Sequence, residues 1–237
     1  MKRLTQQDRL RIRLHAVAML RYAKKYAKYN YLSEHLDIDP SLLARYVSGL
    51  VVPSYEQSLK IISVLEKLMP LDKIILREIE KHHGYIDLTG ILSDPSFLRV
   101  VAFKLATHFK GDKPTAVLVP ETSGISLASF IAEEFPVKII VARRRKDNPL
   151  EDYYEEHLIL PPNVRRIFYI RRRSLSSRDR VLIVDDIVHT GLTLYVLKKL
   201  ISRIDAKLVG VASIVVHGTE WRKRLGDSIK IKSIVSL

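Results

Sequence analysis

The stretch VLIVDDIVHTGLTL, residues 181–194, decides the fold class of this chain. Four apolar residues run directly into two adjacent carboxylates, Asp185 and Asp186. A turn that contains a glycine follows, and then the apolar spacing of a helix over residues 192–204. Two like charges side by side repel each other, and both need partners at the end of a strand. We therefore expect hydroxyl groups, a metal ion or both to meet these two acids.

Strands and helices alternate on both sides of this stretch. Strands are predicted at residues 115–119, 138–141, 181–184 and 208–216, and helices at 95–109, 126–134 and 192–204. This alternation predicts an α/β fold with a parallel sheet that is covered on both faces. Ligands of such sheets bind at the carboxyl ends of the strands. Asp185 and Asp186 lie at one such end, and residues 121–124 lie at another.

Residues 1–80 lack this alternation and have helical spacing instead. Helices are predicted at residues 4–26, 31–36 and 41–48, after Ser54, and at 71–81. Gly49 suits the end of the third helix, and Ser54 with Gln57 forms a capping box. We therefore expect two domains, a small all-α domain over residues 1–80 and an α/β domain over residues 81–237.

The charge and composition of the chain limit the classes of molecule that it is expected to bind. The chain has 237 residues and a net charge of +14, and both predicted domains are basic. Nucleic acid and phosphorylated metabolites are the partners that such a charge favours, although a well-solvated surface also fits. The absence of cysteine excludes disulfides and thiolate chemistry. No apolar run has the length of a membrane span and no segment near Met1 resembles a signal peptide, so we expect a cytoplasmic protein without a membrane partner.

The stretch LSEHLDIDPSLLARYVSGLVVPS, residues 32–54, resembles the DNA-binding domain of phage-repressor-type regulators. The resemblance extends over about residues 8–68 and implies a helix-turn-helix whose second helix is offered to DNA. It implies DNA contacts from Ser41, Arg45, Tyr46 and Ser48. The alternative is a packing or dimerisation module that does not bind DNA.

The opening stretch resembles the signature of the type I phosphoribosyltransferases. The resemblance implies that Asp185 and Asp186 accept hydrogen bonds from the 2- and 3-hydroxyls of the ribose of phosphoribosyl pyrophosphate (PRPP). Carboxylates suit a vicinal diol, and the amides of a loop that opens a helix suit a phosphate. The loop implied to bind the 5-phosphate comprises Val188, His189, Thr190, Gly191, Leu192 and Thr193. The alternative for the two acids is a capping pair before a helix.

Three further segments are similar to parts of that family. VPETSGISLA, residues 119–128, corresponds to the pyrophosphate loop through Glu121, Thr122, Ser123 and Gly124. ARRRKDN, residues 142–148, resembles the segment that stabilises the leaving pyrophosphate, with Arg143, Arg145 and Lys146 as candidates; a solvated run of charges is the alternative. Residues 148–164 fall where the family has a flexible lid, and Glu155 or Glu156 is a candidate for proton transfer at the base.

GYIDLTGILSDPSFLRV, residues 84–100, is similar both to adenine phosphoribosyltransferases and to bacterial purine repressors, which respond to PRPP. The first similarity implies base contacts from Gly84, Tyr85 and Ile86. The chain also departs from the family pattern, because Leu192 replaces a common glycine and His189 stands where small residues are usual. These departures put the identity of the base and the catalytic rate in doubt more than PRPP binding.

Two functions follow from these resemblances. The first is a purine phosphoribosyltransferase, with adenine ahead of other purines and orotate, that forms a nucleoside monophosphate and pyrophosphate from a base and PRPP. Mg²⁺ is its implied cofactor, held through the pyrophosphate and potentially by Asp185 and Asp186. The second is a transcription regulator that binds DNA and responds to PRPP or a nucleotide. By resemblance we expect a homodimer in either case.

Overall fold

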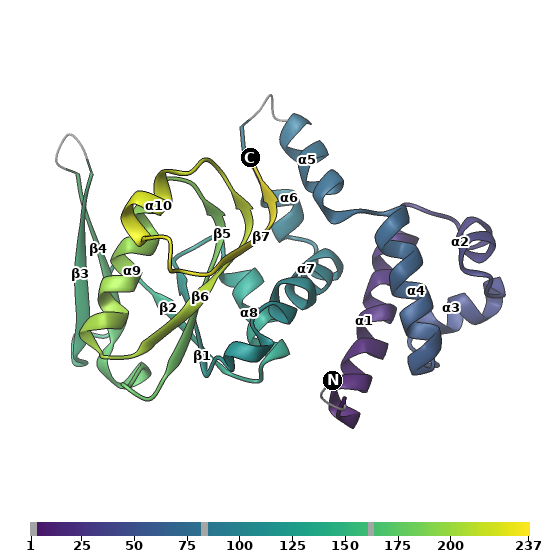
Figure 1. Ribbon diagram of the computed structural model, residues 1–237, viewed down its shortest axis with the longest axis horizontal. Coiled ribbons are helices and arrows are strands. Elements are labelled where there is room, and N and C mark those ends of the chain that lie inside the picture. The colour runs from purple at the N-terminus through teal and green to yellow at the C-terminus, as the bar shows by residue number, and fades with distance from the viewer. Residues whose placement is uncertain (1–3, 82–84, 161–163) are drawn as a thin grey trace. The chain divides into compact units, whose positions relative to one another are not determined.

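The computed structural model describes residues 4–81, 85–160 and 164–237 (Figure 1). They form two compact units, Met1–Val100 and Val101–Leu237. The boundary between the units falls inside α7 (Pro95–Thr107). Our domain boundary near residue 80 stays a prediction.

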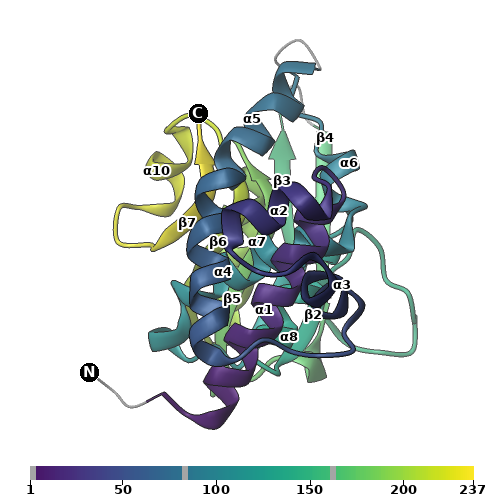
Figure 2. The ribbon, with the colours of Figure 1, turned by 90° about the vertical axis from the view of Figure 1, so that its right-hand side faces the viewer.

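The first unit is helical. Its helices are α1 (Gln6–Lys24), α2 (Tyr29–Leu36), α3 (Pro40–Ser48), α4 (Tyr55–Leu68), α5 (Leu71–Lys81) and the short α6 (Thr89–Leu92). The predicted helices are present, with ends that differ by a few residues. α1 and α4 lie side by side (Figure 2). Apolar residues at helical spacing, among them Leu20, Leu32, Leu43, Ile61 and Leu65, are almost completely buried and form the core of this unit.

Local capping explains where the helices of this unit begin and end. α2 ends at Asp37 in the left-handed conformation, and Asp39 accepts the N–H of Ser41 at 2.8 Å to start α3. Gly49 ends α3 with φ of +84°, as its residue type predicts. The Ser54 hydroxyl accepts the N–H of Gln57 at 3.1 Å, which is the first half of the predicted capping box.

The four residues that were expected to face DNA do not share one exposed surface. Ser41, Arg45 and Ser48 are exposed, whereas Tyr46 is buried in the core of the unit. The Ser48 hydroxyl donates to the carbonyl of Arg45 at 3.1 Å. Arg45 is therefore the member of this set that is both charged and accessible.

The second unit contains the predicted parallel sheet. Its strand order is β2-β1-β5-β6-β7, and every neighbouring pair is parallel. The bounds are β1 Ala116–Pro120, β2 Lys138–Ala142, β5 Arg180–Val188, β6 Lys207–Val216 and β7 Ile231–Ser236. All five residues of β1 are buried, as expected for a strand covered on both faces. The sequence did not predict β7, which pairs with β6 at the edge of the sheet.

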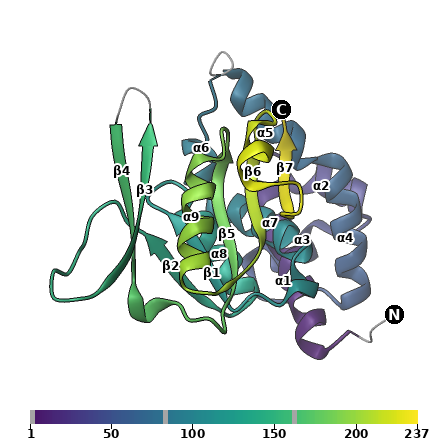
Figure 3. The same ribbon diagram turned by 60° about the vertical axis from the view of Figure 1, so that its left-hand side comes forward.

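Helices cover both faces of this sheet (Figure 3). α9 (Leu192–Arg203) packs on one face, where its apolar side chains form a single buried cluster with alternate residues of β1 and β5, such as Leu118 and Ile183. α8 (Ile125–Glu134) covers the other face. The short α10 (Glu220–Leu225) follows β6. This arrangement brings the loops after β1 and β5 to one edge of the sheet.

A two-stranded antiparallel hairpin, separate from the main sheet, follows β2. It consists of β3 (Tyr153–Leu160) and β4 (Val164–Arg171). The described part of residues 148–164, where the resemblance implies a lid, contains β3, and the role of this segment as a lid stays a prediction. Arg203 of α9 donates to the carbonyl of Glu155 at 2.6 Å, so β3 is fixed to α9. In β4, the buried Phe168 and Ile170 alternate with the partly exposed Ile167 and Tyr169, which is the pattern of a half-buried strand.

Candidate ligand-binding site

A cavity of about 400 Å³ lies at the end of β5, within the second unit. Asp185 and Asp186 line it, together with Thr193 at the start of α9. The sequence predicted that this strand ends at residue 184, but β5 is longer. It continues through both acids to Val188, because residues 187 and 188 still pair with β6. The tandem acids therefore lie on a strand held in the centre of the sheet, which fixes their backbone.

The loop after β1 forms another wall of the cavity. Glu121, Thr122 and Ser123 line it, and the Glu121–Thr122 peptide bond is cis. Gly124 ends the loop and lies against β5. A side chain at this position would lie 3.3 Å from the Cα of Asp185 and 3.3 Å from the backbone N of Asp186. Glycine thus allows the loop to approach the acids closely, and α8 begins at the next residue.

One arginine of the basic run 142–148 reaches the cavity, and it is Arg144. Its backbone N–H donates to the carboxylate of Glu121 at 2.9 Å, which ties the end of β2 to the loop after β1. The sequence had pointed to Arg143, Arg145 and Lys146. Arg144 was missed in the sequence analysis, because the side of the basic run that faces the cavity is set by pairing with β4, which is distant in sequence.

The other members of the basic run have different surroundings. Arg143 pairs through its backbone with Tyr169 of β4, and its guanidinium lies 3.3 Å from Asp147. Lys146 lies 3.5 Å from a carboxylate oxygen of Glu155. Arg145 is exposed and does not line the cavity.

The electrostatics of the acid pair are unusual. Burial of the carboxyl group, and next the charge of Asp186, raise the pKa of Asp185 well above its ordinary value. The backbone N–H of Asp186 donates to Asp185 at 3.1 Å and opposes this shift. The hydroxyl of the buried Ser213 donates to the carbonyl of Asp186 at 2.9 Å. A ligand that donates hydrogen bonds or brings positive charge would therefore satisfy these acids better than the surrounding protein does.

The loop between β5 and α9 packs against α10. Gly191 ends it with φ of +74°, and a side chain there would approach the Cβ of Trp221 to 2.6 Å. Arg224 donates to the carbonyl of Thr190 at 2.8 Å, so α10 holds the loop from outside. The ring of the exposed His189 lies 4.7 Å from that of His217. Because α9 starts directly after this loop, its first amides are available to an anion.

The structure brings together part of the predicted site. Glu121, Thr122, Ser123, Asp185, Asp186 and Thr193 share the cavity, which Pro120, Arg144 and Ile187 complete. Glu155 and Glu156 do not line it. They lie on β3, where Glu156 is 3.5 Å from Lys199 and 3.4 Å from Arg203 of α9.

The predicted base contacts belong to a different part of the chain. Gly84 lies outside the described residues, and Tyr85 and Ile86 belong to the first unit. Tyr85 is 76% exposed, so its ring is available to a ligand. Their role in binding a base stays a prediction.

Neither a metal cluster nor a membrane helix is found in the described part of the chain. Across residues 4–81, 85–160 and 164–237, no three histidine or acidic side chains gather as metal ligands. The donor set at the cavity, two adjacent carboxylates, fits a hard cation that takes its remaining oxygen ligands from a phosphorylated substrate. None of the described helices is long and apolar enough to cross a membrane.

Comparison with known proteins agrees with this geometry. The model of the phosphoribosyl transferase domain matches residues 87–236, which include the cavity and both loops. The chain belongs to this family. The match leaves the five helices α1–α5 outside the family domain.

Relatives from two functional classes are similar in sequence. A probable purine biosynthesis transcriptional regulator of Streptococcus pneumoniae is 28% identical over 156 residues, which are 65% of this chain and 57% of that protein. A xanthine phosphoribosyltransferase of Bacillus cereus is 24% identical over 176 residues, 73% of this chain and 88% of that protein. The match thus spans less than two thirds of the regulator but most of the enzyme.

Solved structures share the fold. The adenine phosphoribosyltransferase of Thermoanaerobacter pseudethanolicus has a TM-score of 0.59 and 23% identity, and covers 65% of this chain and 88% of that one. The enzyme of Rhodothermus marinus has a TM-score of 0.59 and 25% identity, with 65% and 86% covered.

Proposed function

We propose that this chain is a purine phosphoribosyltransferase that joins PRPP and a base into a nucleoside monophosphate and releases pyrophosphate. The single observation that carries the proposal is the cavity of about 400 Å³, in which the tandem acids meet the loop after β1 and the start of α9. We propose adenine as the preferred base. The similarity to a xanthine phosphoribosyltransferase supports a purine, and the fold shared with adenine phosphoribosyltransferases agrees with one.

The acids hold the ribose in this proposal. The two vicinal hydroxyls donate to Asp185 and Asp186, which are rigid because β5 pairs with β6 at and beyond this point. These hydrogen bonds favour the ionised form of Asp185 and so act against the burial that raises its pKa. The 5-phosphate binds to the amides of residues 188–193 at the start of α9.

The loop after β1 receives the pyrophosphate. The bond between the ribose carbon and pyrophosphate breaks while a nitrogen of the base bonds to the same carbon. The proton that this nitrogen loses passes to the departing pyrophosphate. Backbone groups of residues 121–124 and the Arg144 guanidinium bind the departing oxygens, where negative charge grows. Mg²⁺, when bound through the pyrophosphate, neutralises part of that charge. Glu155 and Glu156 take no part in these steps, because both are ion-paired outside the cavity.

A base panel tests this proposal. The full chain is incubated with PRPP, Mg²⁺ and one of adenine, hypoxanthine, guanine, xanthine or orotate, and the nucleotide is identified by chromatography. We expect adenine to give the highest kcat/KM, other purines lower values, and orotate none. PRPP binding without turnover of any base would contradict the enzyme and favour the second candidate below.

A specific observation favours a second candidate, a regulator. The chain has five helices, α1–α5, outside the family domain, with an exposed Arg45 on α3, and it is similar to a probable purine biosynthesis transcriptional regulator. In this proposal a twofold dimer places α3 of each subunit on DNA, and PRPP or a nucleotide changes the affinity.

An anisotropy titration tests the regulator. The DNA is the region upstream of the protein's own coding sequence, with random-sequence competitor and several salt concentrations. Affinity that exceeds the random control, falls steeply with salt and changes with PRPP supports regulation. Affinity equal to that for random DNA and indifferent to PRPP contradicts it. One chain could be both an enzyme and a regulator. The base panel therefore decides whether the chain is an enzyme, and the anisotropy titration decides whether it is a regulator.

A further inference from the structure

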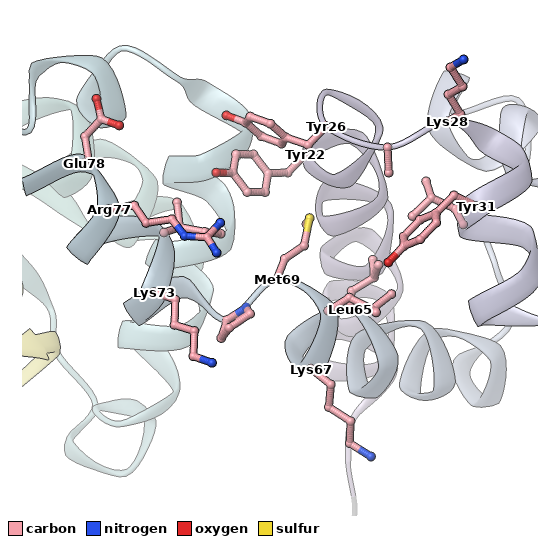
Figure 4. A pocket seen from close by; sticks show the side chains of 15 residues that line it. Tyr22, Tyr26, Lys28, Tyr31, Leu65, Lys67, Met69, Lys73, Arg77 and Glu78 are labelled. Carbon is pink, nitrogen blue, oxygen red and sulfur yellow. The ribbon is translucent and has the colours of Figure 1, made fainter. Parts of the chain in front are cut away.

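A second and larger cavity, of about 910 Å³, lies within the helical unit (Figure 4). It forms where α4 passes into α5. The wall is completed by Tyr22 of α1, Tyr26 in the turn after α1, and Tyr31 of α2. Its volume falls in the range of small-molecule sites, about 300–1,000 Å³. No residue of the transferase cavity belongs to it.

The charges that line this cavity are predominantly positive. Its cations are Lys28, Lys67, Lys73 and Arg77, against a single carboxylate, Glu78. Among the described residues, none of these four cations has a carboxylate within ion-pair distance. The Arg77 side chain extends from α5 towards Tyr22 and Met69, with Lys73 on the same helix, whereas Glu78 points away (Figure 4). An anion placed beside Arg77 would therefore neutralise charge that the protein leaves unpaired.

The remaining wall is aromatic and apolar. Tyr22 is 3% exposed, whereas Tyr26 is 70% and Tyr31 48% exposed, so two rings offer accessible surface beside a buried one. Burial, and next its hydrogen bond with Tyr26, raise the pKa of Tyr22, so its hydroxyl remains protonated. Met69, at the end of α4, adds a thioether that packs well against flat rings. The guanidinium of Arg77 also stacks on planar groups, and it binds phosphate through two N–H donors.

We propose that this cavity is a binding site for a nucleoside phosphate. The base lies between Tyr26 and Met69, and the phosphate binds to Arg77 and Lys73. The ligand contacts α5 together with the residues that follow α1 and α4, so it fixes α5 to the ends of these two helices. The phosphates of a DNA backbone could also bind to Arg77 and Lys73. The bases of a DNA duplex are stacked on one another, however, so they could not pack on the tyrosine wall as the base of a free nucleotide can.

Hydrogen exchange measured by mass spectrometry on the full chain locates the binding. The probes are AMP, ATP, adenosine, inorganic phosphate and a random-sequence duplex. Because nucleotides also have a place in the transferase cavity, protection is scored separately over residues 65–78 and residues 185–195. We expect AMP or ATP to slow exchange over residues 65–78. Adenosine and phosphate alone should each need at least tenfold higher concentrations, because each lacks half of the contacts.

Three variants test whether ligand binding in this cavity causes the protection of residues 65–78. Arg77→Ala should raise the AMP or ATP concentration for half-protection of residues 65–78 at least tenfold, and Arg77→Lys should have an intermediate effect because it keeps the charge but loses the planar fork. Lys60→Ala removes the same charge from α4 outside the cavity and should leave protection unchanged. Protection confined to residues 185–195, equal protection in Arg77→Ala and Lys60→Ala, or protection of residues 65–78 by the duplex alone would each overturn the proposal.

Discussion

Asp185 and Asp186 share their cavity with Arg144, so at the scale of single residues the site offers charge of both signs. A ligand that carries hydroxyl donors at one end and phosphate at the other matches such a division. PRPP is a molecule of this kind, because its ribose hydroxyls suit the acids and its pyrophosphate suits the arginine. The close approach of Gly124 to both acids keeps the two halves of the cavity adjacent.

The substitution Asp186→Asn tests the role of the acids at nearly constant volume. Hydrogen bonds to charged groups contribute about 1.5–3 kcal/mol each, so PRPP affinity should fall at least tenfold and turnover should be lost. Calorimetry with PRPP measures the affinity. Asp227→Asn is the matched control, because Asp227 is exposed and outside the cavity. An unchanged affinity in Asp186→Asn would show that the acids do not hold the ribose.

The raised pKa of Asp185 predicts a pH-dependent cost in the free protein. A carboxyl whose pKa is higher in the folded state binds its proton more tightly there, so stability falls as pH rises from its ordinary pKa to the raised one. Asp185→Asn removes the ionisable group, so the variant does not lose this stability as pH rises. Thermal unfolding without ligand should show a higher Tm for the variant at neutral pH and a smaller difference in acid. A variant that is less stable at neutral pH would contradict the shift.

At the scale of elements, the parallel sheet and its helices could be predicted because their apolar periodicities are local. The ends of β5 could not, because Ile187 and Val188 remain in the sheet only through pairing with β6. The choice of Arg144 over its neighbours depends on the bridge between Arg143 and Tyr169. The pairing of β3 with β4 is local, but no strands were predicted there from the sequence.

The loop before α9 depends on a glycine, and Gly191→Ala tests it. The left-handed backbone costs about 1–2 kcal/mol for a residue with a Cβ, and that Cβ would lie 2.6 Å from the Cβ of Trp221. We expect a loss of PRPP affinity and of stability, measured by calorimetry and thermal unfolding. Gly111→Ala is the control, since no atom lies within 4 Å of the added carbon. Equal behaviour of the two variants would exclude a special role for this loop.

The next prediction concerns Glu155 and Glu156 on β3, the two acids that the sequence analysis named as candidates for proton transfer. Glu155 and Glu156 are held by Lys146, Lys199 and Arg203, so the double variant Glu155→Gln/Glu156→Gln should retain kcat within about threefold. Stability should fall slightly, because surface ion pairs contribute about 0–1 kcal/mol. Steady-state kinetics with adenine and PRPP measure the effect. A loss of kcat near a hundredfold would return these acids to the reaction.

At the scale of the whole molecule, the helices α1–α5 precede the family domain, and a separate cavity lies among them. The net charge of +14 suits phosphorylated ligands and nucleic acid alike. The geometry supports chemistry most directly in the second unit, where the acids, Arg144, the loop after β1 and the start of α9 line one cavity. The first unit adds an exposed Arg45 on α3 and an Arg77 on α5 that has no ion-pair partner among the described residues. Both concern binding rather than turnover.

The mass balance of a single reaction tests the central claim most directly. The full chain, in excess over radiolabelled PRPP, is mixed with adenine and Mg²⁺, and AMP, pyrophosphate and ribose 5-phosphate are quantified over time. A transferase that holds the ribose on Asp185 and Asp186 should form AMP and pyrophosphate in equal amounts as PRPP disappears, with little ribose 5-phosphate, and Asp186→Asn should form neither at a comparable rate. PRPP that is bound but intact at the end, or hydrolysed without AMP, would contradict the proposed function.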